Sequence, residues 1–288
     1  MSANLTKCDA ELAGEVEARP KEHFPPEFGA LGEETDGGSG AQTNSQPARL
    51  ASVEIVTHCY HYPRLLRFQL SSLVLWPPVG VELTMTVCYA PEDTSTEAVL
   101  AEFQTRVVKG VLWNWLPLPA REVCRRSIGR NRAALATRAD WVWFCDADYW
   151  FAAECWPALA SIGPQQNTLV FPRRVHLQRS HALGDACVER VSRTPGLVQA
   201  NVDEFEPVRM RYAIGGIQIV PGDVCRERGY LRDSRRFQRP PRRAVFQKCR
   251  EDVFFRRSLG TRGNPIDLPG VYRIRHSVAG RNDPALRL

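Results

Sequence analysis

The hydrophobic pattern of the chain becomes regular at residue 51. A short apolar run over residues 53–56 ends in the polar pair 57–58, which predicts a strand. Residues 63–75 repeat leucine and valine at spacings of three and four, begin with a proline and end before Pro77, so they predict a helix. The apolar run over residues 81–89 predicts a second strand.

Two polar residues further along mark the expected starts of helices. Thr94, with Glu97 three residues on, has the pattern of a capping box, and Ser127 is the expected cap of a helix over residues 128–137. Residues 141–145 are apolar on both faces, as in a central strand of a parallel sheet. Strands that alternate with helices predict an α/β fold, a single domain with a mostly parallel central sheet and helices on both faces.

Two stretches lie outside this pattern. Residues 1–48 hold nine acidic and three basic residues and a Gly-Gly-Ser-Gly run, and they bury too little apolar area to offset chain entropy. We therefore expect a disordered acidic tail over 1–48 and a folded domain over 49–288. Residues 105–120 show no periodicity that assigns an element.

Composition and charge narrow the classes of function. The 288 residues carry a formal net charge of +6, and the acidic tail offsets part of a more basic body. That body favours a nucleotide, a nucleic acid, a phosphorylated metabolite or a membrane surface as partner. No stretch reaches the ~18 apolar residues of a membrane helix and no secretory signal is evident, so we expect a cytoplasmic protein, with peripheral membrane contact left open. The nine cysteines form no C-x-x-C pair, which argues against structural zinc.

Polar residues follow three of the predicted strands, at 57–58, 92–93 and 146–148. Ligands of such sheets bind beyond the carboxyl ends of the strands, so we expect the three clusters at one edge. Asp146 and Asp148 are two residues apart on an extended chain and project to the same side. A divalent cation bound by their oxygens would relieve their repulsion and hold a diphosphate. An ordinary acidic turn is the alternative.

The helix and strand before these aspartates carry a family pattern. The Arg130-Asn131 pair lies in the helix over 128–137, which leads through the apolar strand to Asp146-Ala147-Asp148. This order resembles the R-N-x-(small)…strand…D-x-D pattern of family 2 nucleotide-sugar glycosyltransferases with the GT-A fold. The resemblance covers about residues 51–280. It implies a GT-A domain and a hexosyltransferase-type enzyme that moves a sugar from a nucleoside diphosphate, with uridine the expected base, to a hydroxyl acceptor.

The resemblance assigns donor binding to four residues. Thr57 matches the end of the family's first strand, and Asp93, or Glu92 if the register slips, matches the acid after the second. These residues would contact the base and ribose, and Arg130 would lie near the base or the diphosphate. The family's usual D-D-G-S is replaced here by Pro-Glu-Asp-Thr-Ser over 91–95. A satisfied backbone group, a turn and a surface ion pair are the structural alternatives for these residues.

The same resemblance predicts a Mn²⁺ or Mg²⁺ site. Asp148 would bind the metal, and Asp146 would face the ribose or a metal-bound water. His276, near the end of the domain, would complete the site as a late histidine does in some GT-A enzymes, although a lone histidine is also a common structural residue. Arg273 and Arg275 would offset the charge of the leaving diphosphate, or are solvated strand residues.

The second half of the chain should supply the acceptor side. Gly215-Gly216 precedes a short apolar strand and matches the family's glycines beside the donor sugar, although a simple bend is an equal interpretation. Glu251 and Asp252 open a helix, where the dipole favours acids in any case. In the family an E-D pair at this stage carries the general base of an inverting transfer, so Asp252, with Glu251 as alternative, is the expected base.

An arginine-rich segment separates these two motifs. Residues 232–243 contain six arginines and a Pro-Pro pair and predict a mobile loop, either plainly solvated or closing as a lid over a diphosphate or an anionic acceptor. Residues 226–243 also fit a nucleic-acid-binding protein, but acidic strand ends would repel a polyanion, so no nucleic acid is expected. An inactive nucleotide-sugar-binding protein is a further alternative. Phosphoryl transfer from Asp146 is disfavoured, since Trp150 replaces the Thr or Val expected there.

Overall fold

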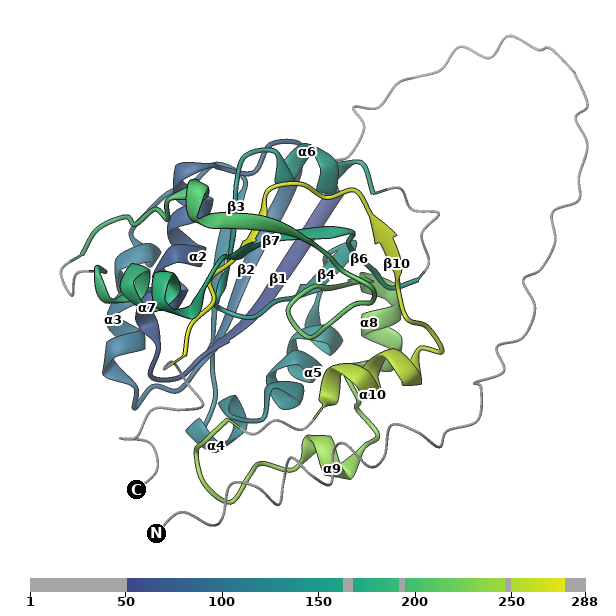
Figure 1. Cartoon of the computed structure of the whole chain (residues 1–288). Coiled ribbons are helices and arrows are strands. Elements are labelled where there is room, and N and C mark those ends of the chain that lie inside the picture. Colours follow the sequence, from purple (N-terminus) through teal and green to yellow (C-terminus); the bar gives the residue numbers. More distant parts are fainter. Residues whose placement is uncertain (1–50, 163–167, 192–194, 247–249, 278–288) are drawn as a thin grey trace, which may run out of the picture. The chain divides into compact units, whose positions relative to one another are not determined.

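The computed structural model describes residues 51–162, 168–191, 195–246 and 250–277. The predicted acidic tail over 1–48 lies outside the described residues. Two sheets form the framework (Figure 1). The central sheet contains, in spatial order, β10 Asn264–Ile266, β6 Val170–Pro172, β9 Gln218–Pro221, β4 Trp141–Phe144, β1 Ala51–Cys59, β2 Val81–Tyr89 and β3 Val111–Pro117.

The core of this sheet is parallel. β1 pairs in parallel with β2 and with β4, and β2 pairs in parallel with β3, whereas β9 runs antiparallel to β4 and β6. Parallel neighbours joined through helices bring the carboxyl ends of β1, β2 and β4 to one edge. The predicted α/β class, with a mostly parallel central sheet, is confirmed and agrees with a GT-A-type domain.

Helices cover both faces of the central sheet (Figure 1). Adjacent residues of β4 show why both faces are buried: the ring of Trp143 packs against Phe151 on one face, and the ring of Phe144 packs against Phe255 on the other. The first face is covered by α2 Pro63–Leu75, α3 Thr94–Gln104 and α6 Cys155–Ala160. The second is covered by α5 Arg126–Ala136, α8 Gly222–Arg228 and α10 Glu251–Ser258.

A smaller sheet adjoins the first face. Its strands, in spatial order, are β5 Tyr149–Phe151, β11 Val271–Arg273, β7 Arg174–Gln178 and β8 Phe205–Arg209. It packs on α2 through a second apolar cluster, in which Trp150 stacks on Tyr272. Only residues 145–148 separate β4 of the central sheet from β5 of the small sheet. The Asp146-Ala147-Asp148 motif therefore spans the passage from one sheet to the other.

Four local predictions need correction. β1 extends to Cys59, so the pair 57–58 lies within the strand. α3 is capped by Asp93, whose carboxylate accepts from the backbone N–H of Thr96, and Thr94 is the first helical residue. Ser127 lies inside α5, where its hydroxyl donates to the carbonyl of Phe237.

The fourth correction concerns the segment 232–243, predicted as a mobile loop. It contains the short helix α9 Arg235–Gln238, and the Phe237 side chain is only 2% exposed. The unassigned stretch 105–120 contains the edge strand β3, whose half-buried residues give no clear apolar pattern. The remaining helices are α4 Ala120–Val123 and α7 His181–Glu189.

Candidate active site

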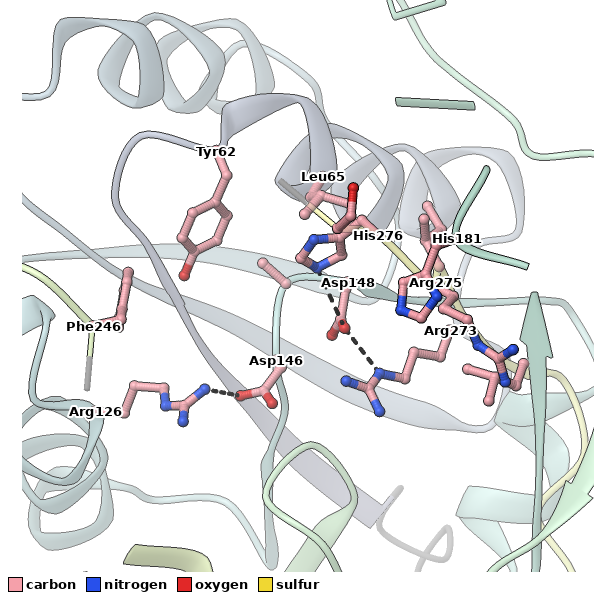
Figure 2. A pocket seen from close by; sticks show the side chains of 14 residues that line it. Tyr62, Leu65, Arg126, Asp146, Asp148, His181, Phe246, Arg273, Arg275 and His276 are labelled. Atoms are coloured by element: carbon pink, nitrogen blue, oxygen red, sulfur yellow. Dashed lines mark hydrogen bonds and ion pairs between the residues drawn. The ribbon is translucent and has the colours of Figure 1, made fainter. Parts of the chain in front are cut away.

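A cavity of about 410 Å³ opens where the two sheets meet (Figure 2). Asp146 and Asp148 line it from the passage between β4 and β5, and Arg126 lines it from the first turn of α5. Arg273 and His276 reach it from the end of β11. The polar residues after the most buried strand thus face a common cavity with cations on two sides.

The two aspartates are held by cations on different walls. The Asp146 carboxylate is 3.0 Å from the guanidinium of Arg130 and 3.3 Å from that of Arg126, both on α5. The Asp148 carboxylate is 2.9 Å from Nε of Arg273 on β11 (Figure 2). Both side chains line one cavity, but they meet different walls, so a cation held by both carboxylates stays a prediction. The relief of repulsion that we assigned to a divalent cation comes here from arginines.

The Asp148 side of the cavity fits a hard cation in part. Asp148 is 7% exposed and its Oδ1 has no hydrogen-bond partner among the described residues. Oδ2 of Asp148 lies 3.8 Å from Nε2 of His276, whose buried Nδ1 also has no partner there. Burial lowers the pKa of His276 and favours the neutral imidazole that binds metals. Across the described ranges, however, no three metal-binding side chains form a group, and Asp146 is turned towards α5.

Arg126 is a site residue that the sequence analysis missed. It bridges two acids, since Nε lies 3.2 Å from a carboxylate oxygen of Glu251 while a terminal nitrogen lies near Asp146. Burial opposes the charge of Arg126, but the carboxylates of Asp146 and Glu251 outweigh it and raise the guanidinium pKa. A spacing of four residues from Arg130 places both arginines on one face of α5, which was the available signal.

Arg130 connects the aspartate motif to the glycine pair. It is 1% exposed and donates at 2.8 Å to the carbonyl of Gly215 as well as to Asp146. It also donates to the hydroxyl of Tyr230 at 3.0 Å. The predicted proximity of Arg130 to a base or diphosphate stays a prediction; its contacts place it between Asp146, Gly215 and Tyr230.

The two acids at the start of α10 differ. Glu251 is 2% exposed and its carboxylate pairs with Arg126. Asp252 is half-buried, its carboxylate makes no hydrogen bond or ion pair with the described residues, and it lies beside Gly215: a methyl group there would be 3.5 Å from the Asp252 Cβ. Of the two, Asp252 keeps its oxygens available.

The adjacent glycines have different surroundings. A methyl group on Gly216 would lie 2.3 Å from the ring of Tyr149, so this glycine is required by packing. Gly215 faces Asp252 and Arg130 at ordinary contact distances. Only Gly215 therefore borders the polar site, and its predicted place beside the donor sugar stays a prediction.

The acids after β2 do not line the cavity. Asp93 accepts from the N–H groups of His61 and Thr96 and from the hydroxyls of Thr96 and Ser95. Burial would raise its pKa, but these hydrogen bonds outweigh burial and lower the pKa. Glu92 is exposed and accepts from the N–H of Ala120. Both oxygens of Asp93 are occupied by these hydrogen bonds at the start of α3. In this structure Asp93 therefore has the structural role that was the alternative to nucleoside binding.

Thr57 and His58 also lie away from the cavity. Both are buried in β1, and neither Oγ1 of Thr57 nor either imidazole nitrogen of His58 has a hydrogen-bond partner among the described residues. Burial lowers the pKa of His58 well below its usual range, with Arg130 and Arg126 adding to the effect. Contacts of Thr57 and of residues 92–93 with a nucleoside stay predictions.

Comparisons with known proteins yield structural likenesses. No protein-family model matches the chain, and no curated protein matches it. The chain is similar to a crystal structure of S. aureus TarS 1–349, at 12% identity and a TM-score of 0.46, over 77% of this chain and 60% of that chain. The same fragment in complex with UDP-GlcNAc matches at 11% identity and a TM-score of 0.47, over 80% and 60%. The chain thus spans less than two thirds of either structure.

The structure contains no helix, over its described residues, that is long and apolar enough to cross a membrane. All seven described cysteines are buried and free; they are Cys59, Cys88, Cys124, Cys145, Cys155, Cys187 and Cys225. None of these seven thiols lines the cavity, whose polar lining consists of carboxylates, guanidinium groups, imidazoles and hydroxyls.

Proposed function

We propose that this protein is an inverting glycosyltransferase that moves a sugar from a nucleoside diphosphate, UDP in the first instance, to a hydroxyl acceptor. One observation carries the proposal. Asp146 and Asp148 line a cavity with cationic walls, Arg126 joins Asp146 to Glu251, and Arg130 joins Asp146 to the carbonyl of Gly215, the glycine beside Asp252. This arrangement supports a diphosphate site in the cavity and a base beside Gly215, next to the residues that line the cavity.

The cations of the cavity support diphosphate binding. Arg126 and Arg273 both line it, and each guanidinium is already oriented by a carboxylate. Arginine offers several N–H donors in a fixed plane that matches phosphate oxygens. In the proposed reaction these groups stabilise negative charge on the departing diphosphate, where such preorganised donors are most effective.

Asp252 is the proposed general base. Its carboxylate removes the proton of the acceptor hydroxyl while that oxygen attacks the anomeric carbon, and the bond from this carbon to the diphosphate oxygen breaks on the opposite side. Attack opposite the leaving group inverts the anomeric configuration. Glu251 is less suited, because its buried carboxylate is held by Arg126.

Asp148 and His276 are the residues proposed to hold Mn²⁺ or Mg²⁺, since each keeps a buried atom without a partner among the described residues. Asp146 would join them only after releasing its arginines. A bound cation would neutralise diphosphate charge as a Lewis acid. Oxygen ligands from carboxylate, diphosphate and water suit either ion.

Calorimetry of UDP binding tests the donor site. The parent protein should bind UDP, and 1 mM Mn²⁺ should tighten the binding by about tenfold or more. Asp148→Asn should abolish the effect of manganese, because one carboxylate charge is lost from the cation site. The matched control is Asp267→Asn, which removes an exposed carboxylate that pairs with Arg173 outside the cavity. If Mn²⁺ tightened UDP binding equally in the parent and in Asp148→Asn, the assignment of the cation site would be refuted.

A further inference from the structure

Positive charge is concentrated in one part of the sequence. Residues 226–262 contain thirteen arginines and lysines against four acids, an excess larger than the net charge of +6 of the whole chain. The rest of the chain is therefore net acidic. Concentrated like charges repel one another in the folded protein, so a charge distribution of this kind indicates an anionic partner.

Five arginines form the exposed centre of this segment. Arg235, Arg236, Arg239, Arg242 and Arg243, here called the arginine face, are all exposed, and none forms an ion pair with another described residue. The arginines of the cavity are different, since Arg126, Arg130 and Arg273 each meet a carboxylate. The arginine face thus presents guanidinium groups whose charge the described part of the chain does not neutralise.

The arginine face is anchored beside the candidate active site. Phe237, within α9, packs its ring 5.0 Å from that of Phe254 on α10, and its carbonyl accepts from Ser127 on α5. Arg121 holds the end of the segment by donating to the carbonyl of Pro241 at 2.8 Å. α9 lies next to α5 and α10 (Figure 1), the helices whose first turns supply Arg126 and Asp252. The backbone that carries these arginines is therefore held against α5 and α10.

From this placement we infer that the arginine face binds the acceptor, and that the acceptor is a chain, other than a nucleic acid, with repeated phosphate or carboxylate groups. The inference rests on the proposed function and names its substrate class. Successive arginines can each bind an oxyanion of a polymer through paired N–H donors, while a hydroxyl of the same polymer reaches Asp252. The acids after β4, which we expected to repel a polyanion, are paired with arginines in the structure: Asp146 with Arg126 and Arg130, and Asp148 with Arg273.

A membrane surface explains the arginine face less well. Basic helices that lie on membranes also present apolar side chains for insertion among the lipids. In α9 the one large apolar side chain, Phe237, points inward and is 2% exposed. Exposed guanidinium groups over an inward aromatic residue fit a soluble polyanion.

Binding of four probes to the full chain tests the inference. The probes are inorganic polyphosphate, oligogalacturonate, a single-stranded DNA oligonucleotide and phosphatidylglycerol vesicles. The test variant combines Arg235→Gln, Arg239→Gln and Arg243→Gln. The matched control combines Arg138→Gln, Arg174→Gln and Arg209→Gln, which removes equal charge from exposed arginines outside the face.

We expect the parent to bind polyphosphate or oligogalacturonate more tightly than DNA or vesicles, and the better of the two identifies the acidic group. The test variant should lose at least about tenfold in affinity for that polymer, with a shallower dependence on salt, because fewer counterions are released. The control should stay within about twofold of the parent. UDP affinity, measured on the same samples, should be equal in all three proteins.

Four results would overturn the inference. Equal losses in the test and control variants would mean diffuse charge attraction. Tighter binding of DNA, or binding of vesicles alone, would assign the face to another class of partner. Binding of polyanions by a parent protein that fails to bind UDP would remove the acceptor role together with the proposed function. UDP binding without any polyanion binding would leave the proposed function standing and reject the anionic acceptor alone.

Discussion

The carboxyl ends of β2 and β4 both carry acids, yet the two ends have different tasks. Asp93, after β2, accepts four hydrogen bonds from residues 61, 95 and 96 and caps α3. Asp148, after β4, lines the cavity and keeps one buried oxygen without a partner among the described residues. Position at the edge of a parallel sheet is therefore insufficient to identify a site, and the number of nearby donors decides whether an acid is available to a ligand.

The same distinction separates the two acids of α10. Glu251 is paired with Arg126, whereas the carboxylate of Asp252 forms no hydrogen bond or ion pair with the described residues. The largest predicted effect comes from this difference. Asp252→Asn should slow sugar transfer by about a hundredfold or more, since a general base is lost. Its UDP affinity should stay within about twofold of the parent, which calorimetry and single-turnover kinetics would measure.

Glu251→Gln is the companion variant. It removes half of the buried pair with Arg126 and should cost about 3 kcal/mol of unfolding free energy. Chemical denaturation would record that cost. A normal transfer rate in Asp252→Asn would show that another group takes the proton and would remove Asp252 from the mechanism.

The acid after β2 should respond in stability. Asp93→Ala should lower the free energy of unfolding by about 2 kcal/mol, because it removes a helix cap and leaves buried donors unpaired. Glu92→Ala, at the exposed neighbour, should change it by less than about 0.5 kcal/mol. UDP affinity of the folded Asp93→Ala protein should be unchanged; a tenfold loss would assign Asp93 to the donor as well.

The pH dependence of this stabilisation has a defined sign. The folded-state pKa of Asp93 is lowered, so the ionised carboxylate stabilises the fold above the ordinary aspartate pKa of about 3.9. The stabilisation is lost as pH falls through the lower folded-state pKa. The difference in unfolding free energy between the parent and Asp93→Ala should therefore shrink below about pH 4. A constant difference down to pH 2 would contradict the role of the charge.

The two glycines of the pair should respond differently to the same substitution. Gly216→Ala should destabilise the protein by about 1–3 kcal/mol, because its methyl group would meet the Tyr149 ring at 2.3 Å. Gly215→Ala should change stability by less than about 0.5 kcal/mol and slow transfer by about tenfold, because it adds bulk beside Asp252. Thermal unfolding and transfer assays on both variants would compare the two. Equal destabilisation by the two substitutions would contradict their different surroundings.

Much of the fold was predictable because apolar periodicity reports burial directly. The strand over 81–89 and the helix over 63–75 have the bounds that the pattern predicts. The edge strand β3 was not predicted from the sequence, because its residues are half-buried or exposed and give no clear apolar pattern. The predicted caps Thr94 and Ser127 were wrong for another reason. Serine and threonine are common helix caps, but here the neighbouring Asp93 accepts from the first turn of α3, and the hydroxyl of Ser127 donates to the distant carbonyl of Phe237.

The candidate site was predictable only in part. Asp146 and Asp148 were found because they come directly after the most apolar strand, and both line the cavity. Arg126 belongs to no motif. Its role depends on Asp146 and Glu251, which the fold places opposite the first turn of α5. Thr57 and Asp93 were assigned by position along the strands, whereas their hydrogen-bond partners depend on tertiary contacts that a sequence pattern leaves unspecified.

The short passage between the sheets has a mechanical consequence. The backbone carbonyl of Asp148 accepts from Ile274 beside β11, while Cys145, one residue before Asp146, donates its backbone N–H to Val56 of β1. The backbone near Asp146 is thus hydrogen-bonded to the central sheet, and the backbone of Asp148 is hydrogen-bonded beside the small sheet. Any shear of one sheet over the other alters the gap between the carboxylates. Substitutions at the Trp150–Tyr272 stack, whose rings do not line the cavity, therefore offer a way to adjust that gap.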